Sequence, residues 1–149
     1  MLAGIKLHDA VEALLQALIC ADGRHCAYFA ARTPANLRAA FSTIRQHKVV
    51  PDKAVYTALA LMHRLLIKHA DVIILTPANA VTTFLTALLV AGKLWLDTPF
   101  NTISFAMLAG VSAHTMFEFE AMFINMLDWD VIVTPGEIAA VTHALQSVD

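Results

Sequence analysis

Residues 78–96 read ANAVTTFLTALLVAGKLWL, a run in which Lys93 is the only charged residue. The other non-apolar positions hold threonines, one asparagine and one glycine, so a helix over this run has no ordinary solvent-facing side. A helix that is apolar all round lies at the centre of a fold or partly under another molecule. We expect both here: other helices cover most of this one, and one stripe is left for a partner.

A membrane-spanning helix is the alternative interpretation, because no charged residue occurs from Val72 to Gly92 and about 20 residues cross a bilayer. Thr76 and Pro77 interrupt that run in the manner of a helix start, with the threonine hydroxyl as the cap and the proline in the first turn. The helix that follows has a length usual for a buried core helix. We therefore predict a buried helix over 78–96 and no transmembrane segment.

The composition of the whole chain narrows its class. The 149 residues are 58% hydrophobic and only 15% charged, which suits a membrane segment or a helical domain that leaves apolar surface for a partner. The net charge of −2 argues against a nucleic-acid partner. Two cysteines make no disulfide framework, and charged residues interrupt the N-terminal stretch where a secretion signal would be apolar. We expect an intracellular protein, in the nucleus or the cytoplasm.

Helix boundaries can be placed from capping residues. A threonine followed by a proline, the pattern at residues 33–34 and 134–135, is typical of a helix start, and Glu137 completes a capping box at the second of these. Gly110 suits the end of one helix, and Ser112 suits the start of the next. The sequence therefore predicts an all-α fold with helices near residues 5–20, 35–47, 52–69, 78–96, 102–109, 113–127 and 136–146.

No signature of an enzyme or a metal site accompanies these helices. The five glycines are isolated, so no glycine-rich loop can cradle a phosphate. Cys20, His25 and Cys26 lie close together in the sequence, but zinc sites usually need a second ligand pair, and we interpret this stretch as a turn. His63 and His69 face different sides of their helix and cannot share a metal ion. We expect no catalytic site, metal, cofactor or small-molecule substrate.

Helical phase places one charge on each of two apolar stripes. Lys93 shares a face with Leu89, and Glu120 shares a face with Phe117 in the equally apolar run 113–127. A lysine stem can lie along such a stripe and present its ammonium group at the rim. Within the chain, the candidate ion-pair partners of Lys93 are Glu118, Glu120 and Asp97.

The order of several short motifs resembles that of the cyclins, in particular the short single-box P/U-type cyclins that include the yeast phosphate-pathway cyclins. No motif is specific alone, but their order and spacing together are. The motifs are ALALMHRL at 58–65, LTPAN at 75–79, TALLVAGK at 86–93, AGVS at 109–112, FEAMF at 119–123 and LDWDV at 127–131.

The resemblance implies a fold and its boundaries. A cyclin box is a five-helix bundle around a central apolar helix, which would occupy residues 34–133 here. Residues 1–33 would form an N-terminal flanking helix and turn, and residues 134–149 a C-terminal flanking helix.

The resemblance also implies a function. The chain would be a non-catalytic regulatory subunit that binds and activates a cyclin-dependent kinase by holding the kinase C helix in its active position. In the family, the residues at Lys93 and Glu120 contact main-chain groups of the kinase. The same comparison adds five residues to the kinase-binding surface: Leu94, Trp95, Ile124, Trp129 and Val131. The alternative is an adaptor with the cyclin fold that binds a non-kinase protein.

Two positions depart from the family pattern. His63 stands where the family has an aspartate, so the internal Asp–Arg ion pair of the family cannot form in its usual version. Gly92 replaces a small serine before Lys93, which loosens the helix end by up to about 1 kcal/mol. Neither departure changes the two charged residues of the predicted site.

Overall fold

The computed structural model describes residues 7–19, 28–30, 37–47, 50–77, 79–95 and 101–147. Within these ranges the chain forms seven α-helices and no strand, so the all-α prediction is confirmed. The helix ends lie within two residues of the predicted ones. The helices are α1 (Leu7–Leu18), α2 (Leu37–His47), α3 (Asp52–Lys68), α4 (Ala80–Trp95), α5 (Thr102–Ala109), α6 (Ala113–Met126) and α7 (Pro135–Gln146).

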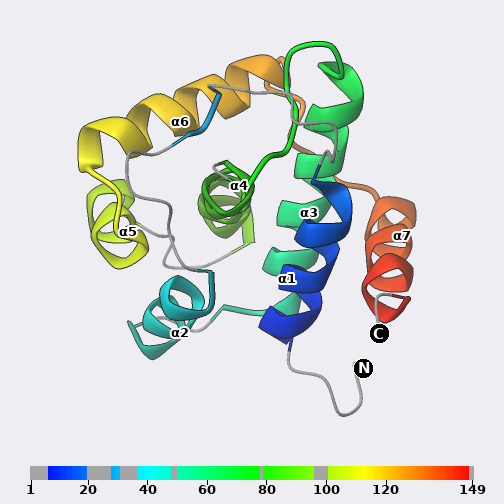
Figure 1. Ribbon diagram of the computed structural model, residues 1–149, viewed down its shortest axis with the longest axis horizontal. Coiled ribbons are helices and arrows are strands. Elements are labelled where there is room, and N and C mark those ends of the chain that lie inside the picture. Colours follow the sequence, from blue (N-terminus) through cyan, green and yellow to red (C-terminus); the bar gives the residue numbers. More distant parts are fainter. Residues whose placement is uncertain are drawn as a thin grey trace.

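Helix α4 lies at the centre of the fold, as the sequence predicts. Figure 1 looks along its axis and shows α2, α3, α5 and α6 arranged around it. Nearly every α4 side chain from Ala80 to Gly92 is buried, including the threonines. The five helices α2 to α6 make the bundle, while α1 and α7 flank it and pack against each other beside α3 (Figure 1).

The buried threonines of α4 satisfy their hydroxyl groups locally. The Thr86 hydroxyl donates to the carbonyl of Thr82 at 2.8 Å, and that of Thr83 donates to the carbonyl of Asn79 at 2.7 Å. The Thr82 hydroxyl donates to the carbonyl of Phe29. A buried hydroxyl is costly only when it is unpaired, so the centre of the fold can hold these threonines.

The start of α4 differs from the prediction in one respect. The side-chain oxygen of Asn79, not the hydroxyl of Thr76, accepts the hydrogen bond from the Thr76 backbone N–H, at 2.8 Å. The Thr76 hydroxyl is buried and has no hydrogen-bond partner among the described residues. The predicted threonine cap is therefore wrong at this helix, because a nearby asparagine satisfies the turn instead.

Three other predicted caps are present. The Ser112 hydroxyl accepts from the backbone N–H of Thr115 at 3.1 Å, and Gly110 adopts the left-handed conformation (φ 75°) that ends α5. Thr134 and Glu137 form the predicted capping box of α7. The predicted start at residues 33–34 lies outside the described ranges.

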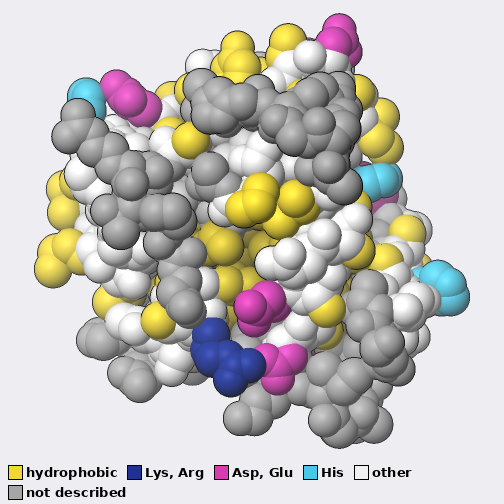
Figure 2. Space-filling model, viewed as in Figure 1, with side chains coloured by type: hydrophobic (Ala, Val, Ile, Leu, Met, Phe, Trp, Pro, Cys, Tyr) yellow, Lys and Arg dark blue, Asp and Glu magenta, His cyan; other side chains and the backbone are white. Residues whose placement is uncertain are grey.

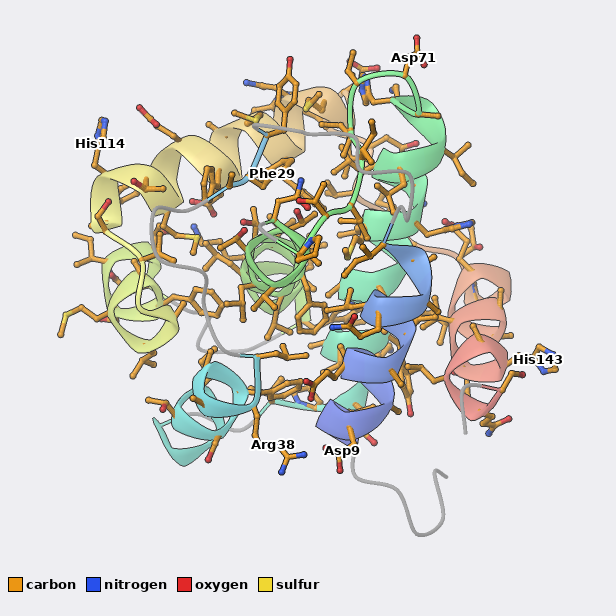
Figure 3. The ribbon with its side chains drawn as sticks, in the orientation of Figure 1. Asp9, Phe29, Arg38, Asp71, His114 and His143 are labelled. Atoms are coloured by element: carbon orange, nitrogen blue, oxygen red, sulfur yellow. The ribbon has the colours of Figure 1, made fainter. Side chains whose placement is uncertain are left out.

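Phe29 connects the stretch between α1 and α2 to the core. Its side chain is fully buried, and its ring centre lies 5.6 Å from that of Phe119 and 6.1 Å from that of Phe123, both on α6 (Figure 3). On the same face of the molecule, Arg38 of α2 forms an ion pair of 2.6 Å with Asp9 of α1 (Figures 2 and 3). These contacts fix the N-terminal flank on the bundle.

No helix in the described ranges is long and apolar enough to cross a membrane.

Candidate partner-binding site

The two charged residues singled out in the sequence meet in space. Lys93 lies in the last turn of α4, Glu120 lies in α6, and their side chains form an ion pair. Thr102, the first residue of α5, completes the cluster. Its hydroxyl accepts from Lys93 Nζ at 2.8 Å and donates to Glu120 Oε1 at 3.1 Å. Three helices of the bundle therefore meet at one charged pair.

The pair sits at the boundary between core and surface. The Glu120 side chain is 11% exposed, whereas that of Lys93 is 37% exposed. A carboxylate this deeply buried is tolerated because a charged partner and a hydroxyl satisfy it. The Lys93 side chain is partly exposed, while its ammonium group bonds to Thr102 and Glu120, both of which are buried.

The structure selects one of the three intrachain partners proposed for Lys93. Glu118 is exposed and lies 2.9 Å from the ring of His114, a pair separated by one helical turn of α6. Asp97 lies outside the described residues. Glu120 is the partner of Lys93 within the described ranges.

Thr102 is a member of the site that sequence reasoning missed. The capping pattern could have located it, because Asn101 caps α5 by accepting from the N–H groups of Ile103 and Ser104 at 2.9 and 3.2 Å. A cap fixes where the helix begins. It does not say which neighbouring helix the next side chain faces.

Exposed apolar side chains surround the charged cluster. Leu94 follows Lys93 and is exposed, and the half-buried Ile124 lies one turn after Glu120 on α6. Two more exposed residues, absent from the predicted set, adjoin members of the cluster by sequence or by one helical turn: Ile103 and Phe117. We call these exposed apolar side chains the rim of the cluster, and exposed apolar side chains gathered in one place are typical of a protein-binding surface.

Trp95 lies apart from this cluster, although the prediction groups the two. Its indole N–H donates to the hydroxyl of Thr57 at 2.7 Å, and Lys53 Nζ lies 3.7 Å from the ring centre. Both partners belong to the first turns of α3. The ring is therefore held against α3 by a hydrogen bond and a cation–π contact, and its exposed part faces outward beside α3.

Trp129 and Val131 follow α6 in the segment that leads to α7. Asp128 and Trp129 both have left-handed backbone conformations, with φ of 54° and 62°. Trp129 is 72% exposed and its indole donates to the Asn125 side chain at 3.1 Å, while Val131 is half-buried against the core. The predicted residues thus lie in three places: the charged cluster with its rim, the start of α3, and the segment after α6.

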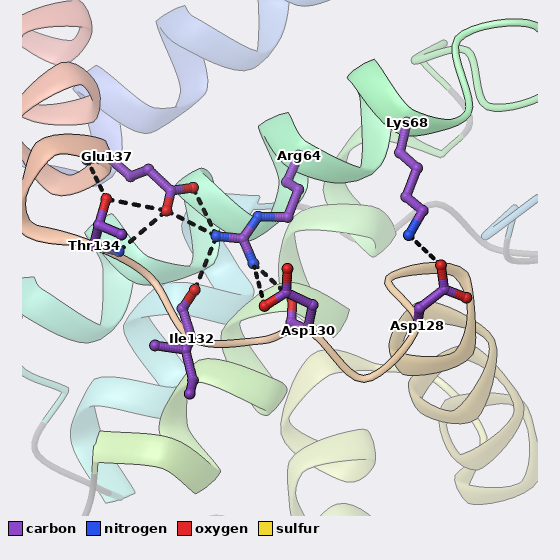
Figure 4. Close-up of polar contacts among 7 residues, drawn as sticks. All are labelled: Arg64, Lys68, Asp128, Asp130, Ile132, Thr134 and Glu137. Atoms are coloured by element: carbon purple, nitrogen blue, oxygen red, sulfur yellow. Dashed lines mark hydrogen bonds and ion pairs between the residues drawn. The ribbon is translucent and has the colours of Figure 1, made fainter.

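Arg64, next to His63 on α3, has a carboxylate partner on another helix. Its guanidinium lies 2.8 Å from both carboxylate oxygens of Glu137 on α7 (Figure 4). It also donates to the backbone carbonyls of Asp130 and Ile132, at 2.6 and 2.9 Å. This ion pair joins α3 to the C-terminal flanking helix.

Arg64 and Lys68 shift the pKa of two of the carboxylates that they contact. Burial raises the pKa of Glu137, but hydrogen bonds from Arg64 and Thr134 outweigh burial and hold that pKa below its ordinary value. The hydrogen bond and charge of Lys68 likewise lower the pKa of Asp128. Both carboxylates are therefore ionised at neutral pH.

A cavity of about 580 Å³ opens between α1, α3 and α7. Its walls are mainly apolar and include Leu14, Leu18, Met62 and Val141. None of the predicted site residues lines it.

Within the described ranges, no group of three or more His, Cys, Asp or Glu side chains is arranged to hold a metal ion. Cys20, His25 and Cys26 lie outside those ranges.

Comparison with known proteins identifies the class to which this fold and surface belong. The sequence matches the family model of the cyclins over residues 10–131, most of the chain. The protein therefore belongs to the cyclin family, whose members are non-catalytic regulators that act through a protein partner. No individual curated protein matches the sequence. The boundaries at residues 34 and 133 stay a prediction.

Proposed function

We propose that this cyclin binds and activates a cyclin-dependent protein kinase, and that it is of the single-box P/U type. The observation that carries the proposal is the Lys93–Glu120 pair, held by Thr102 where α4, α5 and α6 meet. In the family that the sequence resembles, residues at these two positions contact main-chain groups of the kinase. The exposed apolar rim supplies the area that such an interface buries.

Lys93 and Glu120 can each form further hydrogen bonds with a partner protein. An ammonium group has three N–H donors, and Lys93 uses two of them, on Thr102 and Glu120. The third donates to a backbone carbonyl of the kinase, while the remaining lone pairs of Glu120 accept from a backbone N–H. Because the partner covers the pair, these charge-assisted bonds form in a lower dielectric and fix the register of the complex.

Activation follows from binding one kinase conformation better than another. An active kinase has its C helix turned inward, so that a helix glutamate pairs with the ATP-binding lysine. A partner with equal affinity for both conformations would shift nothing. The cyclin surface therefore activates the kinase to the extent that it binds only the conformation with the C helix turned inward.

The first test is direct binding and activity. Candidate cyclin-dependent kinases are mixed with the cyclin, and phosphotransfer is measured with and without it. Lys93→Ala is expected to weaken binding by about 2 kcal/mol or more, roughly thirtyfold, because a desolvated charged contact is lost. Arg38→Ala, which removes an exposed ion pair between α1 and α2, is the matched control and keeps wild-type affinity.

A charge swap separates a partner contact from an internal ion pair. In the Lys93→Glu, Glu120→Lys double variant, opposite charges still face each other, so much of the pairing that holds the three helices is retained. The donor and acceptor positions offered to the kinase are reversed, however. We expect a folded protein that does not bind the kinase. Wild-type affinity in the swapped protein would show that the pair is only structural, and would favour an adaptor for another protein.

A further inference from the structure

The segment between α6 and α7 presents two large apolar side chains without regular secondary structure. Trp129 is 72% exposed and Ile132 is 79% exposed. The chain leaves α6 through two consecutive left-handed residues, Asp128 and Trp129, a conformation that disfavours side chains other than those of glycine, asparagine and aspartate. A strained segment keeps such a shape only when contacts elsewhere hold it.

One guanidinium supplies most of those contacts. Arg64 NH1 donates to the carbonyl of Asp130 at 2.6 Å, and NH2 donates to the carbonyl of Ile132 at 2.9 Å (Figure 4). These two carbonyls lie on either side of Val131. The arginine side chain is only 20% exposed, and its bonds to Glu137 are partly buried, whereas those to the two carbonyls lie at the surface.

The same guanidinium also holds the far end of the segment. Glu137, the third partner of Arg64, accepts from the backbone N–H of Thr134 at 3.1 Å and closes the capping box of α7. At the near end, Lys68 lies one turn after Arg64 on α3 and pairs with Asp128. The last turns of α3 therefore hold the segment at its start, its middle and its end (Figure 4).

From these contacts we propose that Arg64 is a positioning residue of the partner-binding surface. It touches no partner itself; it holds residues 128–134 so that Trp129 and Val131 present their side chains to the kinase. Because Arg64 also binds Glu137, α7 must be docked on α3 for Trp129 and Val131 to be presented in this way. The inference rests on the proposed function, since it takes Trp129 and Val131 as partner contacts.

Arginine suits this position for a geometric reason. The planar guanidinium of Arg64 binds two carbonyls and one carboxylate at once, and the single ammonium group of a lysine cannot do so. Arg64→Lys should therefore keep the charge but lose the positioning, and Arg64→Gln should lose both.

A double-mutant cycle tests the inference in the full-length protein. Arg64→Gln is expected to weaken kinase binding about tenfold in the wild-type background and less than twofold when Trp129 is already alanine, since residues in one contact network are not additive. Arg64→Lys is expected to behave like Arg64→Gln. Arg38→Gln, which removes a guanidinium remote from the segment, should leave affinity unchanged in both backgrounds.

Hydrogen exchange provides a readout without the kinase. The backbone N–H groups of Trp129, Asp130 and Val131 are hydrogen-bonded to nearby carbonyls. In Arg64→Gln and in Glu137→Gln they should exchange at least tenfold faster, while α4 amides keep their protection. A merely stabilising residue would instead speed exchange throughout the bundle.

Three results would overturn the inference: unchanged exchange in the segment, additive affinity losses for Arg64→Gln and Trp129→Ala, or wild-type affinity in Trp129→Ala. None of them affects the proposed function as long as the Lys93 and Glu120 charge swap abolishes binding. Failure of every candidate kinase to bind the wild-type protein would overturn both.

Discussion

Asn79 determines how the central helix begins. Its side chain is buried, its oxygen accepts from the N–H of Thr76, and its amide donates to the carbonyls of Ile74 and Tyr28 at 2.9 and 3.1 Å. One side chain thus connects the loop before α4 to the stretch that carries Phe29. We expect Asn79→Ala to lower the free energy of unfolding by about 3 kcal/mol, because one buried and two partly buried hydrogen bonds are lost. Urea denaturation measures this loss.

Thr76→Val is the control for that prediction. The Thr76 hydroxyl is buried without a partner among the described residues, so replacing it with a methyl group should leave the protein equally stable or more stable. If Thr76→Val instead cost about 1 kcal/mol, the hydroxyl would be acting as a helix cap after all, and the account of Asn79 would be wrong.

Individual residues also show where sequence reasoning stops. The apolar positions of α4 and α6 indicated that Lys93 and Glu120 each lie on an apolar stripe, because helical phase is a local property. The direction in which Trp95 turns depends on Thr57 and Lys53, which lie about forty positions earlier in the chain. No local pattern encodes that contact, so the sequence does not predict it.

At the scale of elements, the pairing of α7 with α3 depends on the ionisation of Glu137. The ordinary pKa of this carboxyl is 4.5, and in the folded protein it is lower because hydrogen bonds from Arg64 and Thr134 outweigh burial. A group with a lowered pKa contributes its stability above the ordinary value and loses it as the pH falls through the folded value. The stability that α7 gains from Glu137 should therefore be intact at pH 7 and fall away below about pH 4.5.

The measurement is urea denaturation at a series of pH values from 7 down to 3. Glu137→Gln should be less stable than the wild type at pH 7, and the difference should shrink as the pH falls below 4.5. Asp128 titrates in the same direction through Lys68, so it contributes equally to the slopes of both proteins. A constant difference between the two proteins over the whole range would contradict the assignment of the ion pair to Arg64.

Helix by helix, the sequence predicts the elements well because their signals are short-range. The capping box at Thr134, the serine cap at Ser112 and the glycine at the end of α5 each involve residues no more than a few positions apart. The contacts between elements are different. Arg64 and Glu137 are separated by 73 positions, and no local sequence pattern indicates that they pair. Only the packing of α7 on α3 brings them together.

Across the whole molecule, the charged cluster and the flanking helices form separate regions joined by α3. The charged cluster of Lys93, Thr102 and Glu120 lies where α4, α5 and α6 meet, whereas the cavity of about 580 Å³ lies between α1, α3 and α7. The small residues Gly136, Ala140 and Ala144 leave this cavity open on the α7 side. Filling it should therefore change the stability of the flanks without changing the charged cluster, and segment 128–134, which the docked α7 helps to hold, should keep its position.

Ala140→Leu tests this separation. The added carbon atoms enter a space lined by Leu14, Leu18 and Met62, and burying them should contribute about 1 kcal/mol, which raises the melting temperature by roughly 2–4 °C. Ala139→Leu, at an exposed position of the same helix that does not line the cavity, is the matched control and should leave the melting temperature unchanged. Kinase affinity should be the same in both variants and the wild type. A melting temperature that falls in Ala140→Leu alone would show that the flanks are already closely packed, and a loss of affinity with higher stability would show that the cavity and the binding surface are coupled.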